Sequence, residues 1–433
     1  MTRTPAIALA AGLALTVTAA TPSITLAQEG TLIPITPATT TGDVDAFTLS
    51  LDGRFIFFVG SVDDGVSGDH LYRIPIDGGT AEIWNDPTLH NDVDEAPIVG
   101  EDFVYFKGDQ TIGNPDNEWF RLPIDGGEQL QITDGTGIAG DGVLIKGGTE
   151  LIYLNDESSD GIFNALTDGS FDIFGITPLD VDIDQFQWEV TADGETLIYG
   201  SQFAGGPQPQ VLGVLPTDGS SFDPQFITPT NVPDFWEIVD GELSDDGQFF
   251  VCTADWDFAD TQSLVRIPTT IGEVEVEPIV TLDESFQDID GLAVSPDSTM
   301  VAFSGDIDTD TVDSLYVVNI DGTGLRNLTP DLPVYADVTG GYGDIRWSAD
   351  SSRIYFIRDR DFDGELALYY VDVDGSTPCR ADIDGDGELT IFDFLGYQNL
   401  FDAGDPQADF DGDGSLSIFD FLAFQNEFDA GCE

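Results

Sequence analysis

The sequence predicts an all-β fold, a seven-bladed β-propeller, with a small helical module at its C-terminal end. Three observations lead to this prediction. Apolar strands recur after Asp/Gly or Ser/Asp turns at intervals of roughly 45 to 55 residues, a period typical of propeller blades. No long stretch with helical periodicity occurs before residue 389. A 23-residue segment near the C-terminus is then almost repeated.

The first segment, residues 1–27, is predicted to be a signal peptide. Arg3 supplies positive charge, and the apolar run "AIALAAGLALTVTAA" at 6–20 is too short to span a bilayer comfortably. Small residues in "TLA" at 25–27 suit cleavage after Ala27. We therefore expect a secreted or cell-envelope protein with no membrane span in the mature chain. A retained anchor is the alternative.

The propeller is assigned to residues 28–375. Its turn-and-strand units begin at Ser50, Val99, Lys146, Thr191, Leu243, Val294 and Trp347. Each unit continues into a second strand, such as "HLYRIPIDGG", and most close with a third, such as "EQLQIT" or "LRNLTP". The strands are short and bounded by Gly, Asp, Pro and Ser. Seven four-stranded sheets around an axis account for this pattern, and a six-bladed ring is the alternative.

A closing strand is expected at residues 31–37, "TLIPITP", which resembles the last strand of a blade but precedes the first unit. The last unit ends at "LYYVDVDGS" and lacks such a strand. Because an open ring would leave a sheet edge exposed, we expect the N-terminal strand to complete the seventh blade.

The C-terminal module, residues 376–433, contains two loops with the ligand spacing of an EF-hand. Counting from Asp382 and from Asp409, 17 of 23 aligned residues are identical. Alternating Asp side chains converge on a hard cation, and a Gly at position 6 permits the sharp turn. We therefore predict two Ca²⁺ sites. The expected ligands are Asp382, Asp384, Asp386, Glu388, Thr390 and Asp393 in the first loop, and Asp409, Asp411, Asp413, Ser415, Ser417 and Asp420 in the second.

A helix is expected after each loop. Aromatic residues lie three or four apart at Phe394, Tyr397 and Phe401, and again at Phe421, Phe424 and Phe428. These stripes predict that the two helices pack against each other.

The charge is strongly negative. The chain has 82 Asp and Glu residues against 13 Lys and Arg, which gives a formal net charge of −69. Such a field repels nucleic acid and anionic lipid and suits divalent cations or a salty medium. Most of these carboxylates are explained by a solvated acidic surface.

The residues 295–329, "SPDSTMVAFSGDIDTDTVDSLYVVNIDGTGLRNLT", resemble a TolB-type propeller repeat. The match is fair in the units from Thr191 and Trp347 and loose elsewhere. The resemblance implies a propeller in the cell envelope or outside the cell, but no activity.

The duplicated loops resemble dockerin modules of the variety that ends in "DAGC", because position 12 is Asp and no full helix precedes the first loop. Dockerins attach secreted proteins to cohesin-bearing partners. Loop positions 10 and 11, where such modules recognise their partner, are Ile391–Phe392 and Ile418–Phe419 here. Those positions often bear hydroxyl groups in dockerins but are apolar here, which puts recognition by a cohesin of the usual kind in doubt. We expect a protein partner, cohesin-like or unknown. The alternative is that Ile391 and Ile418 are buried under the loops.

The same resemblance places Cys379 and Cys432 at the two ends of the module, where a disulfide is expected. Cys252, in "QFFVCTA", is expected to be a buried strand thiol.

The search for catalytic residues is mostly negative. His70 and His90 lie in loop-like stretches, and no H-E-x-x-H or G-x-S-x-G motif occurs. Two acid clusters are best explained as solvated blade loops, namely Asp306, Asp308, Asp310 and Asp313, and Asp359, Asp361 and Asp363.

The first hypothesis is therefore an exported, non-catalytic propeller that binds a protein or glycan and is docked by its calcium module. The alternative is a propeller-fold polysaccharide lyase or glycosidase. An Arg, His and carboxylate cluster at the channel mouth would favour the enzyme.

Overall fold

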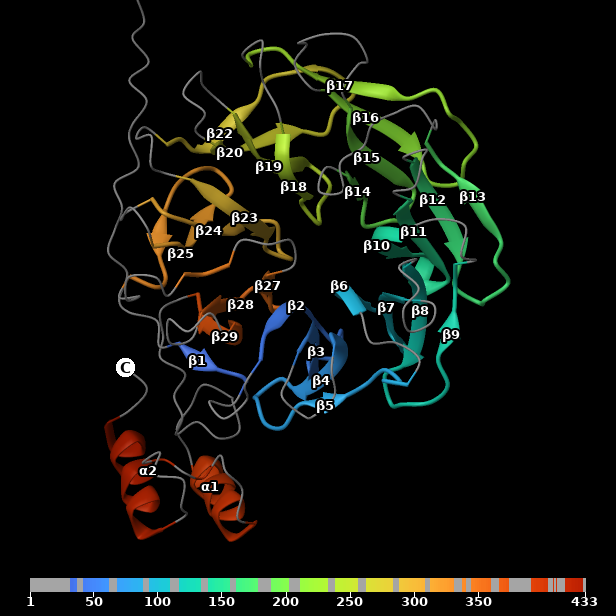
Figure 1. Cartoon of the computed structure of the whole chain (residues 1–433). Helices are drawn as coiled ribbons and strands as arrows, with labels where there is room; N and C mark the ends of the chain where they lie inside the picture. The colour runs from blue at the N-terminus through green and yellow to red at the C-terminus, as the bar shows by residue number, and fades with distance from the viewer. Residues whose placement is uncertain are drawn as a thin grey trace, which may run out of the picture.

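The protein is a ring of seven β-sheets with two helices at its C-terminal end (Figure 1). The computed structural model describes residues 32–36, 42–61, 68–88, 93–109, 117–133, 139–155, 161–177, 188–201, 211–232, 238–255, 262–282, 288–307, 312–330, 337–339, 344–359, 366–373, 391–403, 408, 410 and 417–430. Seven blades confirm the predicted architecture and exclude the six-bladed alternative. Within the described ranges, no helix is long and apolar enough to cross a membrane.

The first four blades follow one another in chain order, each with its innermost strand first. Blade 1 contains β2 (Val44–Leu49), β3 (Phe55–Gly60), β4 (His70–Pro75) and β5 (Glu82–Ile83). Blade 2 contains β6 (Val93–Val99), β7 (Phe103–Asp109), β8 (Asn117–Pro123) and β9 (Leu130–Gln131). Blade 3 contains β10 (Ala139–Ile145), β11 (Glu150–Asn155), β12 (Gly161–Leu166) and β13 (Ile173–Gly175). Blade 4 contains β14 (Trp188–Val190), β15 (Thr196–Ser201), β16 (Val211–Pro216) and β17 (Gln225–Pro229).

The remaining three blades continue the order, and the last one takes its outer strand from the N-terminal segment. Blade 5 contains β18 (Ile238–Leu243), β19 (Phe249–Asp255), β20 (Gln262–Pro268) and β22 (Glu277–Val280). Blade 6 contains β23 (Ile289–Val294), β24 (Met300–Gly305), β25 (Ser314–Asn319) and β26 (Arg326–Asn327). Blade 7 contains β27 (Ile345–Trp347), β28 (Arg353–Asp359), β29 (Leu366–Asp372) and β1 (Ile33–Pro34).

Ring closure depends on β1. Ile33 and Pro34 pair antiparallel with Tyr370 and Tyr369 of β29, and the Ile35 N–H donates to the Leu368 carbonyl at 2.9 Å. The strand lies within the 31–37 segment from which the sequence predicts closure. Blade 7 therefore has four strands although only three follow each other in the chain.

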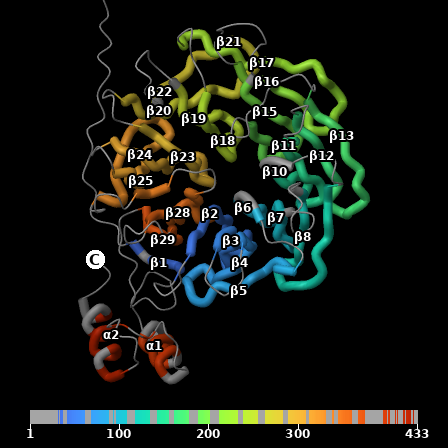
Figure 2. The backbone as a smooth tube through the Cα atoms, viewed as in Figure 1, coloured from blue at the N-terminus to red at the C-terminus, as the bar shows by residue number. Residues whose placement is uncertain are grey.

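Blade 4 carries a fifth strand that the sequence pattern did not predict. β21 (Gly272–Val274) leaves blade 5 between β20 and β22 and pairs parallel with β17 (Figure 2). Asn231 holds the same segment through both amide atoms, accepting from the Val276 N–H at 2.7 Å and donating to the Val276 carbonyl at 2.9 Å. Blades 4 and 5 are therefore joined at the outer side of the ring.

The core lies between neighbouring blades. Side chains of blades 1 and 7 form one cluster, which includes Phe58, Tyr72, Ile357 and Leu368, each 1% exposed or less. Because each sheet buries both faces against its neighbours, the strands are nearly continuous apolar runs.

The turns after the inner strands explain the repeated Ser-x-Asp pattern. In blade 5, Ser244 Oγ donates to Asp246 at 2.8 Å, and Gly247 takes the left-handed conformation, with φ of +68°. In blades 6 and 7 a serine occupies that left-handed position. Ser351 Oγ there accepts the Asp297 N–H of the preceding blade at 3.2 Å. The turns thus also contact one another between blades.

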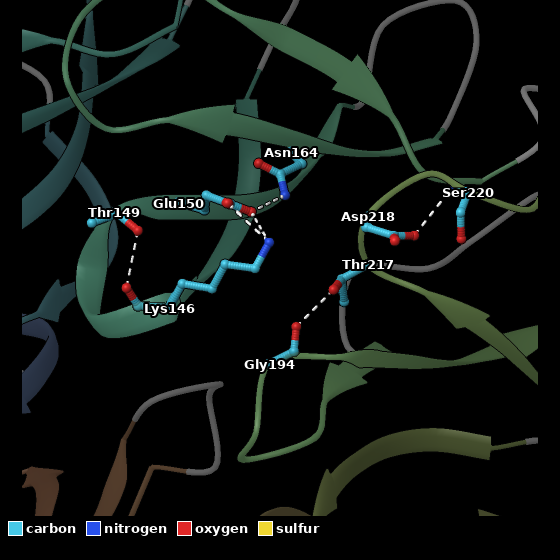
Figure 3. Close-up of polar contacts among 8 residues, drawn as sticks. All are labelled: Lys146, Thr149, Glu150, Asn164, Gly194, Thr217, Asp218 and Ser220. Carbon is cyan, nitrogen blue, oxygen red and sulfur yellow. Dashed lines mark hydrogen bonds and ion pairs between the residues drawn. The ribbon is translucent and has the colours of Figure 1, made fainter.

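Lys146 is held in the corresponding turn of blade 3 (Figure 3). Its ammonium pairs with both oxygens of Glu150 at 2.9 Å, and Asn164 Nδ2 donates to the same carboxylate at 2.7 Å. Asp218, in a nearby turn of blade 4, accepts the Ser220 N–H at 2.9 Å. This lysine, one of two in the chain, is therefore engaged in a structural ion pair.

The two helices are α1 (Ile391–Ala403) and α2 (Ile418–Ala430). Tyr397 and Phe424 stack with ring centroids 4.1 Å apart, and Phe410 meets both rings edge-on. Phe394, Phe401, Phe421 and Phe428 surround this pair. The predicted packing of the aromatic stripes is confirmed.

Candidate functional site

Three carboxylates and one cation lie on the innermost strands of blades 4, 5 and 7, β14, β18 and β27, which surround the axis of the ring (Figure 1). Trp188 and Val190 of β14 are buried at 4% and 8% exposure, so the intervening Glu189 faces the other side of that strand. Asp240 and Glu242 lie two apart on β18 and share a face, and Arg346 lies on β27. All four side chains keep partial solvent contact although protein surrounds them.

Two of these carboxylates hold the inner strand of blade 6. Glu242 Oε2 accepts the Val294 N–H at 2.6 Å, and Asp240 accepts the Leu292 N–H. From the opposite side, Trp347 Nε1 of blade 7 donates to the Ala293 carbonyl at 2.9 Å. Side chains of blades 5 and 7 therefore fix three successive residues of β23.

The electrostatics of these carboxylates favour their neutral forms. Burial, followed by the charge of Glu242, raises the pKa of Glu189 to about 8. Burial also raises the pKa of Glu242 to about 7 and that of Asp240 to about 6. Arg346 lowers the pKa of all three, but burial outweighs its charge. Glu189 is therefore protonated at neutral pH, Glu242 titrates close to it, and Asp240 is mostly ionised there.

A second group of acids lies at the end of the ring where the inner strands begin. Burial raises the pKa of Asp45 to about 6 and that of Asp313 to about 7, and neighbouring Asp residues add to both shifts. Asp313, which the sequence assigned to a solvated loop, is thus partly desolvated and lies among like charges. Asp308, Asp310, Asp361 and Asp363 lie outside the described residues.

The acids at the opposite end behave differently. In the turns after the inner strands, hydrogen bonds from Ser and Thr lower the pKa of Asp193, Asp297 and Asp350. Those carboxylates are turn-forming groups. Among the described residues, no three or more His, Cys, Asp or Glu side chains are placed to hold a metal ion.

The histidine prediction needs a correction. His70 was assigned to a loop, but it is the first residue of β4 and is fully buried, with Nδ1 3.4 Å from Asn85 Nδ2. The segment "HLYRIPIDGG", predicted from the blade pattern as a second strand, already begins with His70. His90 lies outside the described residues. Cys252 is a free thiol buried on β19, as expected, and burial raises its pKa.

Most predicted calcium ligands lie outside the described residues. They are Asp382, Asp384, Asp386, Glu388, Thr390, Asp409, Asp411, Asp413 and Ser415, and Cys379 and Cys432 also lie outside. Asp393 is placed in α1 by its backbone. At the end of the second loop, the Ser417 N–H donates to Asp420 Oδ2 at 2.6 Å, and Asp420 is fully buried in the first turn of α2. A carboxylate held at the loop end suits position 12 of a calcium loop.

The predicted contact residues are placed in part. Ile418 is 64% exposed, so it is not buried under the loop as the alternative reading held. Side chains of Ile391, Phe392 and Phe419 lie outside the described part of the helices. Leu422, one turn after Ile418, is 47% exposed, and its counterpart Leu395 in α1 is 46% exposed. Sequence reasoning missed these two leucines, although their i, i+4 spacing from Ile391 and Ile418 indicates a shared helix face.

Sequence reasoning also missed the channel residues Glu189, Asp240, Glu242 and Arg346. The available signal was a charged residue between apolar ones in "WEV", "DGEL" and "IRW". Such alternation is equally typical of a half-exposed strand.

A scan against protein-family models and a search of curated proteins find no match to this chain. Solved structures do match its fold. An oligogalacturonate lyase in complex with manganese shares 14% identity at a TM-score of 0.57, over 82% of this chain and 96% of that one. A prolyl endopeptidase shares 12% identity at a TM-score of 0.52, over 77% of this chain and 50% of that one. This chain therefore spans about half the length of that peptidase.

The propeller domain of the Trilobed protease from Pyrococcus furiosus shares 9% identity at a TM-score of 0.51, over 76% of this chain and 97% of that one. That domain has an open velcro topology, whereas β1 pairs with β29 here. Identities this low establish the propeller fold alone.

Proposed function

We propose that this is an exported binding protein whose propeller holds a ligand at its carboxylate-lined channel and whose C-terminal module docks it, with two Ca²⁺ ions, to a protein partner. The observation that carries the proposal is the use of the channel carboxylates. Asp240 and Glu242 are committed to the backbone of blade 6. Glu189 accepts only from its own neighbour, the Val190 N–H, among the hydrogen bonds that affect its pKa.

This arrangement suits binding better than acid–base catalysis. A glycosidase needs two carboxyl groups that both reach the substrate, one as acid and one as base or nucleophile. Of these three described carboxylates, Glu189 is the one for which no hydrogen bond from the backbone of another blade is found. The one described histidine, His70, is buried in blade 1. The channel therefore offers one proton donor beside one cation, Arg346.

The charge of the whole chain indicates the class of ligand. Its net charge of −69 repels an anionic ligand. A neutral glycan or a basic protein segment is compatible with this field.

The test is a titration of the mature protein with neutral oligosaccharides and with a basic peptide, followed by analysis of the ligand. We expect saturable binding that Glu189→Gln alters, and recovery of the ligand unchanged. Cleaved ligand would overturn the non-catalytic assignment. Failure of every probe to bind would overturn the binding role of the channel.

A polysaccharide lyase is the second candidate. The structural likeness to oligogalacturonate lyase covers nearly all of that chain, so a ring of this size alone suffices for that enzyme. The net charge of −69 of the chain opposes this candidate, because oligogalacturonate is a polyanion. Incubation with oligogalacturonate and Mn²⁺ decides it, since elimination leaves a double bond that absorbs in the ultraviolet.

The docking role is supported by the exposed apolar side chains of the helices. Ile418, Leu422 and Leu395 are each at least 46% exposed, and exposed apolar groups of this kind mark contact surfaces. We expect a secreted or cell-surface protein to be retained in a pull-down with calcium and lost with chelator. A folded Ile391→Asp, Ile418→Asp variant that retains the partner equally well would contradict the assignment.

A further inference from the structure

Three phenylalanine side chains are exposed on the outer strands and turns of blades 3 and 4. Phe171, before β13, is 46% exposed, Phe174 of β13 is 39% exposed, and Phe222, in the turn before β17, is 55% exposed. The Phe174 ring lies against the turn of blade 4, because a Cβ on Gly219 would be 3.1 Å from it. We call these three side chains the rim surface. Exposed aromatic side chains grouped in this way indicate a contact surface.

Phe171 is kept in a costly backbone conformation. Its φ of +57° lies in the left-handed region, which bulky residues rarely adopt. The turn "TDGSFD" that contains Phe171 recurs in blade 4 as "TDGSSFD", with Phe222 at the matching place. Two neighbouring blades therefore carry a phenylalanine in an exposed turn, where the packing of the core does not require one.

The backbone of β13 is open on its outer side (Figure 1). On the inner side, the Leu166 N–H donates to the Asp172 carbonyl at 3.2 Å, and the Ile176 N–H donates to the Ile162 carbonyl at 2.7 Å. Bonding alternates along an antiparallel pair, so Ile173 and Gly175 direct their backbone groups outward. Within the described ranges, no further strand pairs with this side of β13.

Blade 4 shows what such an edge accepts. Its segment "FDPQFITP" matches "FDIFGITP" of blade 3. In blade 4, the Ile-Thr-Pro end of that segment, Ile227–Pro229, pairs with the added strand β21. An edge of this sequence is therefore suited to one more extended segment, and an exposed sheet edge is a common place for a peptide to bind.

Carboxylates flank the rim surface on both blades. The four exposed ones are Asp168, Asp172, Asp218 and Asp223. The side-chain hydrogen bond with Ser170 lowers the pKa of Asp168, and the one with Ser220 lowers the pKa of Asp218. Both groups are therefore negatively charged at neutral pH.

Two cations act on these carboxylates, and both are engaged elsewhere. The charge of Lys146 lowers the pKa of Asp218, but its ammonium is held by both oxygens of Glu150 (Figure 3). The charge of Arg121 lowers the pKa of Asp168, while its guanidinium covers the Phe103 ring at 4.3 Å from the centroid. The surroundings of the rim surface are therefore apolar and acidic.

We propose that an extended segment of a partner protein, in which apolar residues alternate with Lys or Arg, adds to β13 as a fifth strand of blade 3. The backbone of that segment pairs with Ile173 and Gly175, an apolar side chain covers Phe174, and its cations face the carboxylates. A second copy of this chain brings its own net charge of −69 to the contact and is repelled. The residues involved differ from those of the channel and of the C-terminal helices.

The test uses the mature protein and a short labelled peptide in which Val and Lys alternate. Fluorescence anisotropy measures its binding. One control peptide has Glu in place of Lys, and another has N-methyl groups on alternate backbone nitrogens, which removes the donors of a strand pair. We expect both controls to bind at least about 10-fold more weakly than the Val-Lys peptide.

Variants of the rim surface locate the binding. Phe174→Gln introduces the residue that blade 4 has at the matching position, Gln225, and should weaken binding about 3- to 10-fold. Leu51→Gln, at a 65% exposed leucine of blade 1, is its control and should change nothing. Asp172→Asn should weaken binding and reduce its dependence on salt, and it provides a result if Phe174→Gln does not fold. Asp125→Asn, at an exposed aspartate of blade 2, is the matched charge control.

Two further variants separate this surface from the other proposed sites. Glu189→Gln in the channel and Ile418→Asp on the C-terminal helices should leave binding of the Val-Lys peptide unchanged. Loss of binding in either variant, with binding retained in Phe174→Gln or Asp172→Asn, would assign the peptide to another site and overturn the proposal.

The proposal is also overturned if the Val-Lys peptide does not bind, or if the N-methylated peptide binds equally well, because strand addition needs the backbone donors. A dimer of this chain, detected by sedimentation and abolished by Phe174→Gln, would show that a second copy occupies the edge and would overturn it too.

Discussion

Glu189 carries a proton at neutral pH because protein surrounds its carboxyl and Glu242 lies nearby. Its pKa rises from 4.5 in the unfolded chain to about 8 in the fold. A raised carboxyl pKa means that the folded state binds the proton more tightly. The resulting stabilisation is complete below about pH 4.5 and is lost as the pH rises through about 8. Glu242 and Asp240 add losses of the same sign.

Replacement of Glu189 by glutamine should therefore stabilise the protein at alkaline pH. Glu189→Gln cannot ionise, so we expect its free energy of unfolding at pH 9 to exceed that of the wild type by about 1–3 kcal/mol. At pH 4.5 the two should be nearly equal. Urea unfolding at both pH values measures the difference. Glu195→Gln, on an exposed turn of the same blade, is the control, and an equal gain in that variant would refute the explanation.

Gly305 is the last residue of β24 and lies in close contact with the backbone of Asp288, directly before the inner strand β23. A Cβ at this position would collide with the carbonyl oxygen of Asp288, and a Cβ at Gly60 of blade 1 would meet Asp43 in the same way. Backbone cannot yield as a flexible side chain can, so Gly305→Ala should destabilise the protein by about 1–3 kcal/mol.

The neighbouring residue provides the control for that substitution. Ser304 is fully buried, and its Oγ has no partner among the described residues. Ser304→Ala removes an unsatisfied hydroxyl and should be neutral or slightly stabilising. Thermal unfolding compares the two variants, and a larger loss in Ser304→Ala than in Gly305→Ala would contradict the close-approach explanation.

At the scale of elements, the short strand β1 closes the ring by completing blade 7. Two residues pair with β29, but the segment also buries Ile35 to 2% exposure in the core between blades 7 and 1. Asp43, further along, accepts the Leu366 N–H at 3.0 Å. The N-terminal segment therefore joins the first blade to the last.

Deletion of residues 31–37 should lower the unfolding free energy by at least about 2 kcal/mol, because the burial of Ile35 and the edge pairing of β29 are both lost. Differential scanning calorimetry of the truncated protein measures this change. Deletion of residues 28–30 alone serves as the control, since it leaves β1 in place. Equal melting temperatures for the 31–37 deletion and the intact protein would show that closure contributes nothing.

β21 links blades 4 and 5 in a similar way, as β1 links blades 7 and 1. It crosses to the neighbouring sheet and is held there by the bidentate contact of Asn231 with Val276. The same two blades carry Glu189, Asp240 and Glu242 at the inner side. The outer strand exchange thus stabilises the pair of blades whose inner strands bear the buried carboxyl groups.

At the scale of the molecule, we expect bound calcium to reduce the repulsion between the negative charges of the C-terminal module. Eight Asp residues are among the predicted ligands, and like charges at this density oppose folding without a cation. We expect calorimetry of the mature protein to find two Ca²⁺ ions. Asp384→Ala and Asp411→Ala should each remove one, while Asp405→Ala, outside both loops, should remove none. Uptake of no calcium by the wild type would refute the assignment.

The cysteines give a separate test of the module. We expect mass mapping of the protein to find Cys379 linked to Cys432 and Cys252 free. Such a link should stabilise the module by about 4 kcal/mol through the entropy of the unfolded chain. The buried position of Cys252 on β19 makes a link from that residue to either of the others incompatible with the fold.

The sequence by itself determined the propeller architecture, the helices and their aromatic contact, and it favoured seven blades over six. These features depend on local patterns: a turn every blade, short apolar strands, and aromatic residues three and four apart on a helix. The position of the closing strand was also readable, because one unit lacked a strand and the N-terminal segment had the pattern to supply it. Each inference needed only neighbouring residues and the rule that a sheet edge is covered.

Only the tertiary structure brought together Glu189, Glu242 and Arg346, which lie on three blades and are up to 157 positions apart, from 189 to 346. It likewise decided that β21 joins blade 4 and that Trp84 lines a pocket shared with blade 2. The reason is physical. A carboxyl pKa and an unused donor depend on what surrounds an atom in space, whereas local patterns report only which face of its own strand a residue occupies.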